Sequence, residues 1–253
     1  MVDMEQLELI YFQNNKPVPY LLQCGVEILI YPIRLEDWSV FYSSLTVFTI
    51  EKVEYNDLDI LKLPYIDFLK FLIKQNDVHE AMIYNVLSQS LKEKNIAISQ
   101  SNGKSVIAIL DEEDSIKSII TSKEMEEIKK IILKQNIYNY NDRYISPDIK
   151  KEIEAYNKIR YKGVVQPNFE KEKVFVMSKS GMSEDALNKM YYRTFSLMFR
   201  MMVDNDIYFA NKMLESSPKY DVKEGSMHPL FAKEDDGISS AFTSSDKLKG
   251  KIK

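Results

Sequence analysis

The segment NIAISQSNGKSVIAIL (residues 95–110) constrains the fold most, because it predicts a β-hairpin in a chain whose other long segments are mostly helical in pattern. Asn102 and Gly103 suit the two central positions of a type I′ turn, and β-branched residues flank them. Strands early in the chain and helices later predict an α+β fold. We expect N-terminal strands and a hairpin packed with helices, then a mainly helical C-terminal half and a flexible tail.

Other segments suggest further extended structure. LELIYF (7–12) and VEILIYPIRL (26–35) have strand-like patterns, the second with apolar residues at alternate positions. The prolines of NNKPVPY (14–20) predict a turn or polyproline conformation between them. KVFVMSKS (173–180) is typical of a short strand or an extended lead-in to a helix.

Apolar residues at helical spacing predict seven helices, at 36–48, 63–76, 79–94, 121–136, 146–159, 183–203 and 206–217. Thr121 and Glu124 have the spacing of a capping box, and Ser146 and Ser183 suit N-cap positions. In the helix at 121–136 we expect a buried face formed by Met125, Ile128, Ile131 and Ile132.

A polar cluster separates two of these helices and consists of Asn136, Asn139, Asn141 and Asp142. It does not fit a calcium-binding loop of the EF-hand type, because the required glycine is missing. We therefore interpret these residues as caps of two helices that meet at a corner rather than as ligands.

The composition changes after Pro218, where polar residues surround short apolar islands such as MHPLF and ISSAF. This change predicts three regions: an α+β domain at 1–115, a helical domain at 116–217 and a flexible tail at 218–253. The tail is expected to carry docking motifs.

Charge and cysteine content exclude several classes of protein. The net charge is −4 and the basic residues are spread along the chain, which argues against nucleic-acid binding. The single cysteine, Cys24, permits neither a disulfide framework nor a zinc cluster, so a reducing cytoplasm is expected. Acidic residues near the N-terminus do not suit a signal peptide, and no apolar run is long enough to span a membrane.

Motifs for catalysis are weak. The sequence GKS at 103–105 lacks the glycine that a phosphate-binding loop needs at position 98, which is Ile98. A histidine base would have to be His79 or His228, and no nucleophile motif accompanies either. We expect no enzyme activity and no cofactor or metal, although a metal-dependent enzyme that uses acidic residues remains a remote alternative.

Methionine is concentrated near the C-terminal end, where seven of the 12 methionines fall between Met177 and Met213. Two interpretations stay open. The residues line a core between the helices at 183–203 and 206–217, or they form an adaptable groove for a helical partner. On the second interpretation the candidate partner-binding residues are Met190, Met198, Met201, Met202, Met213, Pro229, Leu230 and Phe231.

Three blocks of the sequence resemble proteins of tailed bacteriophages. ILIYPIRLEDWSVFYSSLTVFTIEK with ILKLPYIDFLKFLI resembles the N-terminal block of tail or baseplate assembly proteins, and EEIKKIILKQNIYNYNDRYISPDI resembles a middle block of the same group. GMSEDALNKMYYRTFSLMFRMM with MHPLF resembles the C-terminal block of tail assembly chaperones. The blocks occur in order over about half of the chain.

The resemblance implies a non-enzymatic role in virion morphogenesis, as a chaperone that binds a tape-measure or baseplate-hub protein. It implies the host cytoplasm as the site of action, with retention in the virion as an open alternative, and leaves a homo-oligomer open as well. A structural baseplate or neck subunit is the main alternative.

Overall fold

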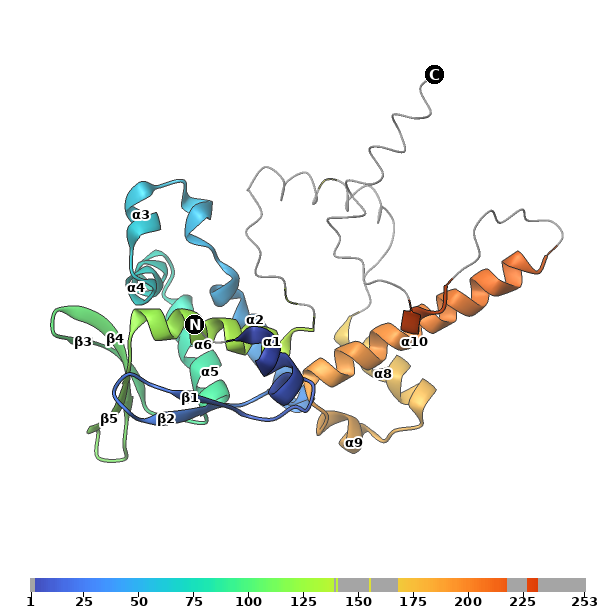
Figure 1. The fold of residues 1–253 in the computed structure, drawn as a ribbon, viewed down its shortest axis with the longest axis horizontal. Helices are drawn as coiled ribbons and strands as arrows, with labels where there is room; N and C mark the ends of the chain where they lie inside the picture. The colour runs from blue at the N-terminus through green and yellow to red at the C-terminus, as the bar shows by residue number, and fades with distance from the viewer. Residues whose placement is uncertain (1–2, 139, 141–154, 156–167, 218–226, 232–253) are drawn as a thin grey trace, which may run out of the picture. The chain divides into compact units, whose positions relative to one another are not determined.

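The computed structural model describes residues 3–138, 140, 155, 168–217 and 227–231, and its fold is α+β (Figure 1). The chain forms two compact units, which are described separately below. The first consists of Met1–Asp142 with Ser183–Ser196, and the second of Arg143–Met182 with Leu197–Lys253. The helix predicted at 146–159, apart from residue 155, and most of the tail predicted at 218–253 lie outside the described residues.

The N-terminus is helical, so the strand expected at 7–12 is wrong. Helix α1 (Met4–Leu7) continues into a π-helical turn, η1 (Glu8–Phe12). Asp3 caps the start, because its carboxylate accepts hydrogen bonds from the backbone of Glu5 and Gln6. The cap begins a helix over residues whose sequence pattern would otherwise suit a strand.

Strands β1 (Val18–Leu21) and β2 (Glu27–Ile30) form an antiparallel pair in the register Val18↔Ile30 to Leu21↔Glu27. The strand expected at 26–35 is thus confirmed at its start. The expected turn at 14–20 instead ends in β1, which includes Pro19. A proline is tolerated there because the sheet has two strands and each has a free edge.

The helices predicted at 36–48, 63–76 and 79–94 are present, and two short helical elements that were not predicted lie between the first two. The elements are α2 (Leu35–Thr49), the 3₁₀ turn η2 (Lys52–Tyr55), α3 (Leu58–Lys62), α4 (Tyr65–Gln75) and α5 (Val78–Leu91). Helix α2 packs against α5, and α4 packs against α5. The fully buried side chains of these helices include Phe41, Leu45, Phe48, Ile66, Leu69, Leu72, Ile83, Val86 and Leu87.

The predicted hairpin is confirmed and belongs to a three-stranded antiparallel sheet in the order β3-β4-β5. Its strands are β3 (Ile96–Ser101), β4 (Lys104–Leu110) and β5 (Ile116–Ile120). Asn102 and Gly103 both have positive φ, at 51° and 75°, as a type I′ turn requires. Figure 1 shows this sheet in the first unit, where β4 contacts α4.

Helix α6 (Ser122–Asn136) completes the core of the first unit and packs against α4. Its predicted capping box is present, because Thr121 and Glu124 each bond to the other's backbone N–H. The predicted face of Met125, Ile128, Ile131 and Ile132 is fully buried.

The predicted boundary at residue 115 falls between β4 and β5, which pair with each other. Hydrogen bonds along this ladder join the residues on both sides of the boundary into one sheet. The first unit therefore continues through β5 and α6.

The last helices differ from the predicted ones. Residues 169–180 form helix α8 (Phe169–Ser180) and not a strand, because Asn168 caps its start and Gly181, at φ 72°, ends it. A short helix, α9 (Glu184–Asn188), follows the predicted N-cap Ser183. Helix α10 (Tyr192–Glu215) then runs without interruption through residues 204–206, where a break was expected.

The predicted helix at 183–203 is interrupted at residues 189–191 by backbone pairing in the first unit. The N–H of Leu35 donates to the carbonyl of Met190 (2.8 Å), and the N–H of Tyr192 donates to the carbonyl of Ile33 (3.0 Å). Arg34 and Tyr191 form an isolated antiparallel bridge between these contacts. Pairing with a distant segment therefore overrides the local helical pattern.

Candidate functional site

The second unit presents a row of apolar side chains along α10, which we call the methionine stripe: Met198, Met202, Phe209 and Met213. Successive members are four, seven and four residues apart, so they lie on one side of the helix. At 1.5 Å per residue the stripe is about 22 Å long. Met198 and Met202 are half-buried, whereas Phe209 is 57% and Met213 74% exposed.

A different side of α10 is covered by α8. The rings of Phe175 and Phe199 meet edge to face at 5.7 Å, and the ammonium of Lys179 pairs with the carboxylate of Asp206 at 2.8 Å. Val176 of α8 is fully buried. On a helical wheel, Phe199 and Asp206 fall beside the stripe and not within it. Sequence analysis missed this contact because residues 173–180 were expected to be extended.

The predicted partner-binding residues lie in two places. Met190 is half-buried in the first unit, between α9 and α10. Met198, Met201, Met202 and Met213 lie on α10 in the second unit. None of these five side chains is buried, and α10 replaces the two helices that were expected to enclose a core. The interpretation as a core between those helices is therefore wrong.

The predicted docking motif MHPLF lies against α10. Pro229–Phe231 form a single 3₁₀ turn, η3, and the ring of His228 meets that of Tyr208 at 5.0 Å. The ring nitrogen Nδ1 of His228 also accepts the backbone N–H of Leu230 (3.3 Å). Pro229 is half-buried and Leu230 is exposed; the side chain of Phe231 lies outside the described residues.

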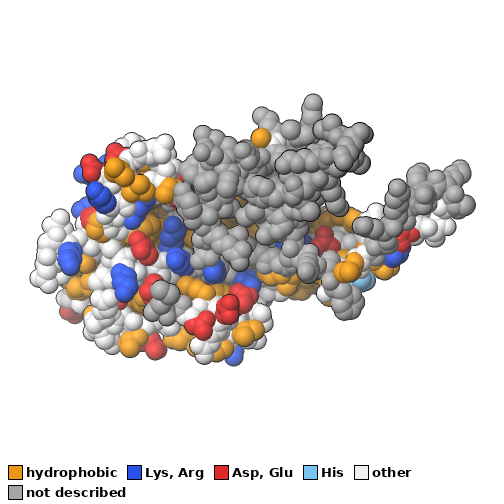
Figure 2. All heavy atoms as spheres, turned by 45° about the horizontal axis from the view of Figure 1, so that its top comes forward, with side chains coloured by type: hydrophobic (Ala, Val, Ile, Leu, Met, Phe, Trp, Pro, Cys, Tyr) orange, Lys and Arg blue, Asp and Glu red, His pale blue; other side chains and the backbone are white. Residues whose placement is uncertain are grey.

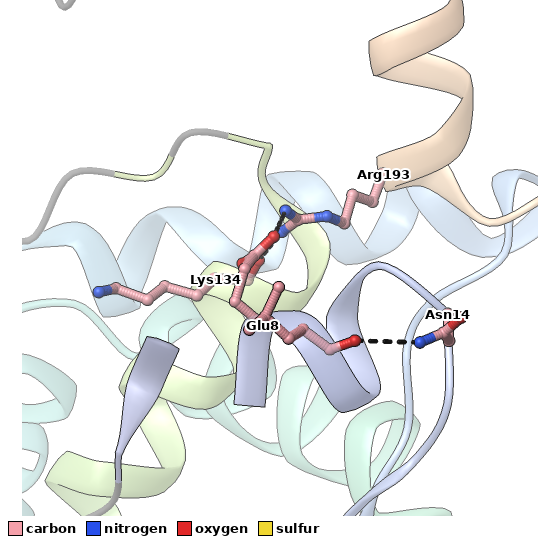
Figure 3. Close-up of polar contacts among 5 residues, drawn as sticks. Glu8, Asn14, Lys134 and Arg193 are labelled. Atoms are coloured by element: carbon pink, nitrogen blue, oxygen red, sulfur yellow. Dashed lines mark hydrogen bonds and ion pairs between the residues drawn. The ribbon is translucent and has the colours of Figure 1, made fainter. Parts of the chain in front are cut away.

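The first turn of α10 is held in the first unit by Arg193, whose side chain is 10% exposed. Its guanidinium pairs with the carboxylate of Glu8 and donates to the backbone carbonyl of Lys134. Figure 3 shows the Lys134 side chain extending away from this contact. The guanidinium also lies over the rings of Phe12 and Tyr138, at 5.9 Å and 5.4 Å from their centroids.

A cavity of about 560 Å³ lies beside Arg193. Its lining includes Met4, Leu9, Gln13, Ile137 and Tyr138. Because Glu8 and the Lys134 carbonyl already engage the guanidinium, Arg193 is best explained as an anchor that joins α10 to η1 and α6. Asn14 supports the same region by donating to the carbonyl of Leu9 at 3.1 Å (Figure 3).

The end of α6 carries two polar side chains whose role was missed. Asn136 was expected to cap a helix, but it is the last residue of α6 and is buried. Its amide oxygen accepts the N–H of Ile33 (2.8 Å), and its amide nitrogen donates to the carbonyl of Ile132 (2.9 Å). The neighbouring Gln135 donates to the carbonyls of Lys16 and Ile30. These residues tie the chain around β2 to α6.

The groups considered for chemistry are scattered. Nδ1 of His79 lies 2.9 Å from the carbonyl of Leu72, and Cys24 is exposed. Within the residues that the structure describes, no three His, Cys, Asp or Glu side chains are grouped so that they could hold a metal ion. Among the described helices, none is both long and apolar enough to span a membrane.

Charges of both signs are interspersed on the face of the molecule shown in Figure 2, alongside scattered apolar side chains. Comparison of the chain with known protein families, with characterised proteins and with solved structures finds no match. Function must therefore be inferred from the sequence and from the site itself.

Proposed function

We propose that this chain is a non-enzymatic assembly factor that binds an apolar, helical segment of a bacteriophage tail or baseplate protein along the methionine stripe of α10. The observation that carries the proposal is the exposure of large apolar side chains at the far end of the stripe, at Phe209 and Met213. Grouped apolar side chains in water mark a binding surface more often than isolated ones do.

The chemistry of the stripe suits a partner helix. Methionine side chains are flexible and polarizable, so they adapt to apolar partners of varied shape. A stripe of about 22 Å matches roughly four turns of an amphipathic helix, which contacts its groove through residues at helical spacing. The exposed Met227 and Leu230 lie in the segment that contacts Tyr208 and would add apolar surface on another side of α10.

The assignment to phage tail assembly rests on the three sequence blocks that resemble tail assembly proteins. On this proposal the partner is a tape-measure or baseplate-hub protein, which exposes apolar segments before it assembles. A chaperone of this kind acts in the host cytoplasm, where it shields those segments from each other.

The test is binding of the purified chain to the tape-measure and baseplate-hub proteins encoded in the same phage genome, measured by calorimetry or pull-down. We expect Phe209→Lys and Met213→Lys to weaken binding at least about tenfold, because each places a charge within an apolar contact. Ala210→Lys is the matched control, since Ala210 is exposed on α10 outside the stripe. Equal binding by all three variants would reject the proposal.

The alternative is a structural baseplate or neck subunit, which mass spectrometry of purified particles distinguishes. Stoichiometric presence in mature virions favours the structural role, whereas absence from virions favours the chaperone.

A further inference from the structure

A second cavity, of about 270 Å³, lies in the first unit at the start of α4 and the middle of α6. Its apolar wall is formed by Ile50, Phe68 and Leu133. Its polar lining is formed by Tyr65 and Tyr140 and by the charged residues Glu51, Lys52, Glu126, Lys129 and Lys130. A concave apolar site with a few converging polar groups is the usual form of a small-molecule site.

Two polar side chains that line this cavity have no hydrogen-bond partner among the described residues. Tyr65 is 4% exposed, and its buried hydroxyl has no hydrogen-bond partner within the part of the chain that the structure describes. Its neighbour Lys129 places an ammonium 5.0 Å from the centroid of the Tyr65 ring. Among the described residues, none accepts a hydrogen bond from this ammonium. Buried polar groups nearly always have a partner, so an unpaired buried hydroxyl beside a half-buried cation indicates a missing acceptor.

The charges around the cavity favour an anionic acceptor. Glu126 lies 3.7 Å from the ammonium of Lys52, which also donates to the carbonyl of Leu63 (2.6 Å). The lining as a whole carries three lysines and two glutamates, which leaves one excess positive charge. One acidic group on a ligand would balance it.

We propose that this cavity binds a small organic acid. Its carboxylate accepts one hydrogen bond from the Lys129 ammonium and one from the Tyr65 hydroxyl. Its apolar body packs against Ile50, Phe68 and Leu133. The volume of about 270 Å³ suits a compact molecule with a single ring.

The environment of the two donors agrees with this assignment. Burial raises the pKa of the Tyr65 phenol, so the hydroxyl keeps its proton and can donate. Burial also lowers the pKa of Lys129, against the opposing influence of Glu51 and Glu126. A bound carboxylate would reverse this change, because an adjacent anion favours the charged ammonium.

Benzoate is a suitable probe, because it combines one carboxylate with one apolar ring. Benzamide has the same shape without the charge, and inorganic phosphate has charge without an apolar body. We expect calorimetry on the full chain to detect benzoate binding, with benzamide and phosphate at least about tenfold weaker. Benzoate is also expected to raise the melting temperature, because it binds the folded state.

Two variants and one control locate the site. Lys129→Met and Tyr65→Phe are each expected to weaken benzoate binding at least about tenfold. Lys123→Met removes a charge from an exposed position on α6 that does not line the cavity, so its binding should equal that of the unaltered chain. Without benzoate, Tyr65→Phe should melt at the same temperature as the unaltered chain or higher, because it removes an unpaired hydroxyl.

Several results would overturn the proposal. They are the absence of benzoate binding at millimolar concentration, equal affinity for benzamide or phosphate, and unchanged binding by Tyr65→Phe. A lower melting temperature of Tyr65→Phe without benzoate would also overturn it, because ordered water would then already satisfy the hydroxyl.

Discussion

The contacts of Arg193 at the start of α10 provide the most direct test of what stabilises the fold of this chain. Replacing Arg193 with methionine keeps most of the apolar stem but removes the guanidinium from its buried position. The carboxylate of Glu8 and the carbonyl of Lys134 then each lose a charged donor. Two ring contacts, with Phe12 and Tyr138, are lost as well.

The expected cost follows from these contacts. A hydrogen bond that involves a charged group contributes about 1.5–3 kcal/mol, and a cation–π contact contributes about 0.5–1 kcal/mol. The Glu8 side chain is 34% exposed, so water compensates part of its loss. We therefore expect Arg193→Met to lower the free energy of unfolding by about 2–4 kcal/mol. For a chain of this size that corresponds to a fall of roughly 4–16 °C in melting temperature.

Trp38 provides a local assay, because it is the single tryptophan of the chain and its ring stacks on that of Tyr192 at an angle of 11°. Urea unfolding followed by Trp38 fluorescence therefore reports on the start of α10. Arg200→Met is the control, since Arg200 is exposed on the same helix and its loss should change stability by less than about 0.5 kcal/mol. If Arg193→Met cost no more than this control, Arg193 would not be an anchor.

Two further predictions concern α6. Asn136→Ala should lower the free energy of unfolding by about 2–3 kcal/mol in the same assay, because it leaves the N–H of Ile33 buried without an acceptor; a loss below about 1 kcal/mol would contradict this role. The second concerns pH and Lys129. Burial lowers the pKa of Lys129 in the folded chain below the ordinary value of 10.5. At pH values between the two pKa values, the unfolded chain binds more protons than the folded chain. The free energy of unfolding therefore rises with pH in that range. The stability of the unaltered chain relative to Lys129→Met should therefore increase as the pH rises toward 10.5, and a constant or falling difference would argue against a lowered pKa of Lys129. The neighbouring charged or titratable groups, which both proteins share, are Glu51, Lys52, Tyr65, Glu126 and Lys130.

The features that the sequence determined by itself are those that local chemistry controls. Asn102-Gly103 permits the positive φ values of the hairpin turn whatever surrounds it. Thr121 and Glu124 satisfy the first N–H groups of α6 within one turn, and the period of apolar residues sets its buried face. These elements, and the α+β class that follows from them, were predictable for this reason.

Other features depended on partners far along the chain, and sequence patterns did not reveal them. The helical pattern at 183–203 is interrupted because residues 190–192 pair with the backbone before α2. The role of Asn136 depends on Ile33, more than a hundred residues away.

The two candidate sites also combine features that the sequence showed with features that only the tertiary structure showed. The methionines of α10 were visible in the sequence as a cluster, but only the tertiary structure showed which of them are exposed. Nothing in the sequence linked Lys129 to Tyr65, because their meeting depends on the packing of α6 against α4. Short-range hydrogen bonds and helical periodicity determine local elements. The free-energy balance of the packed core decides which distant side chains meet and which polar groups remain unpaired.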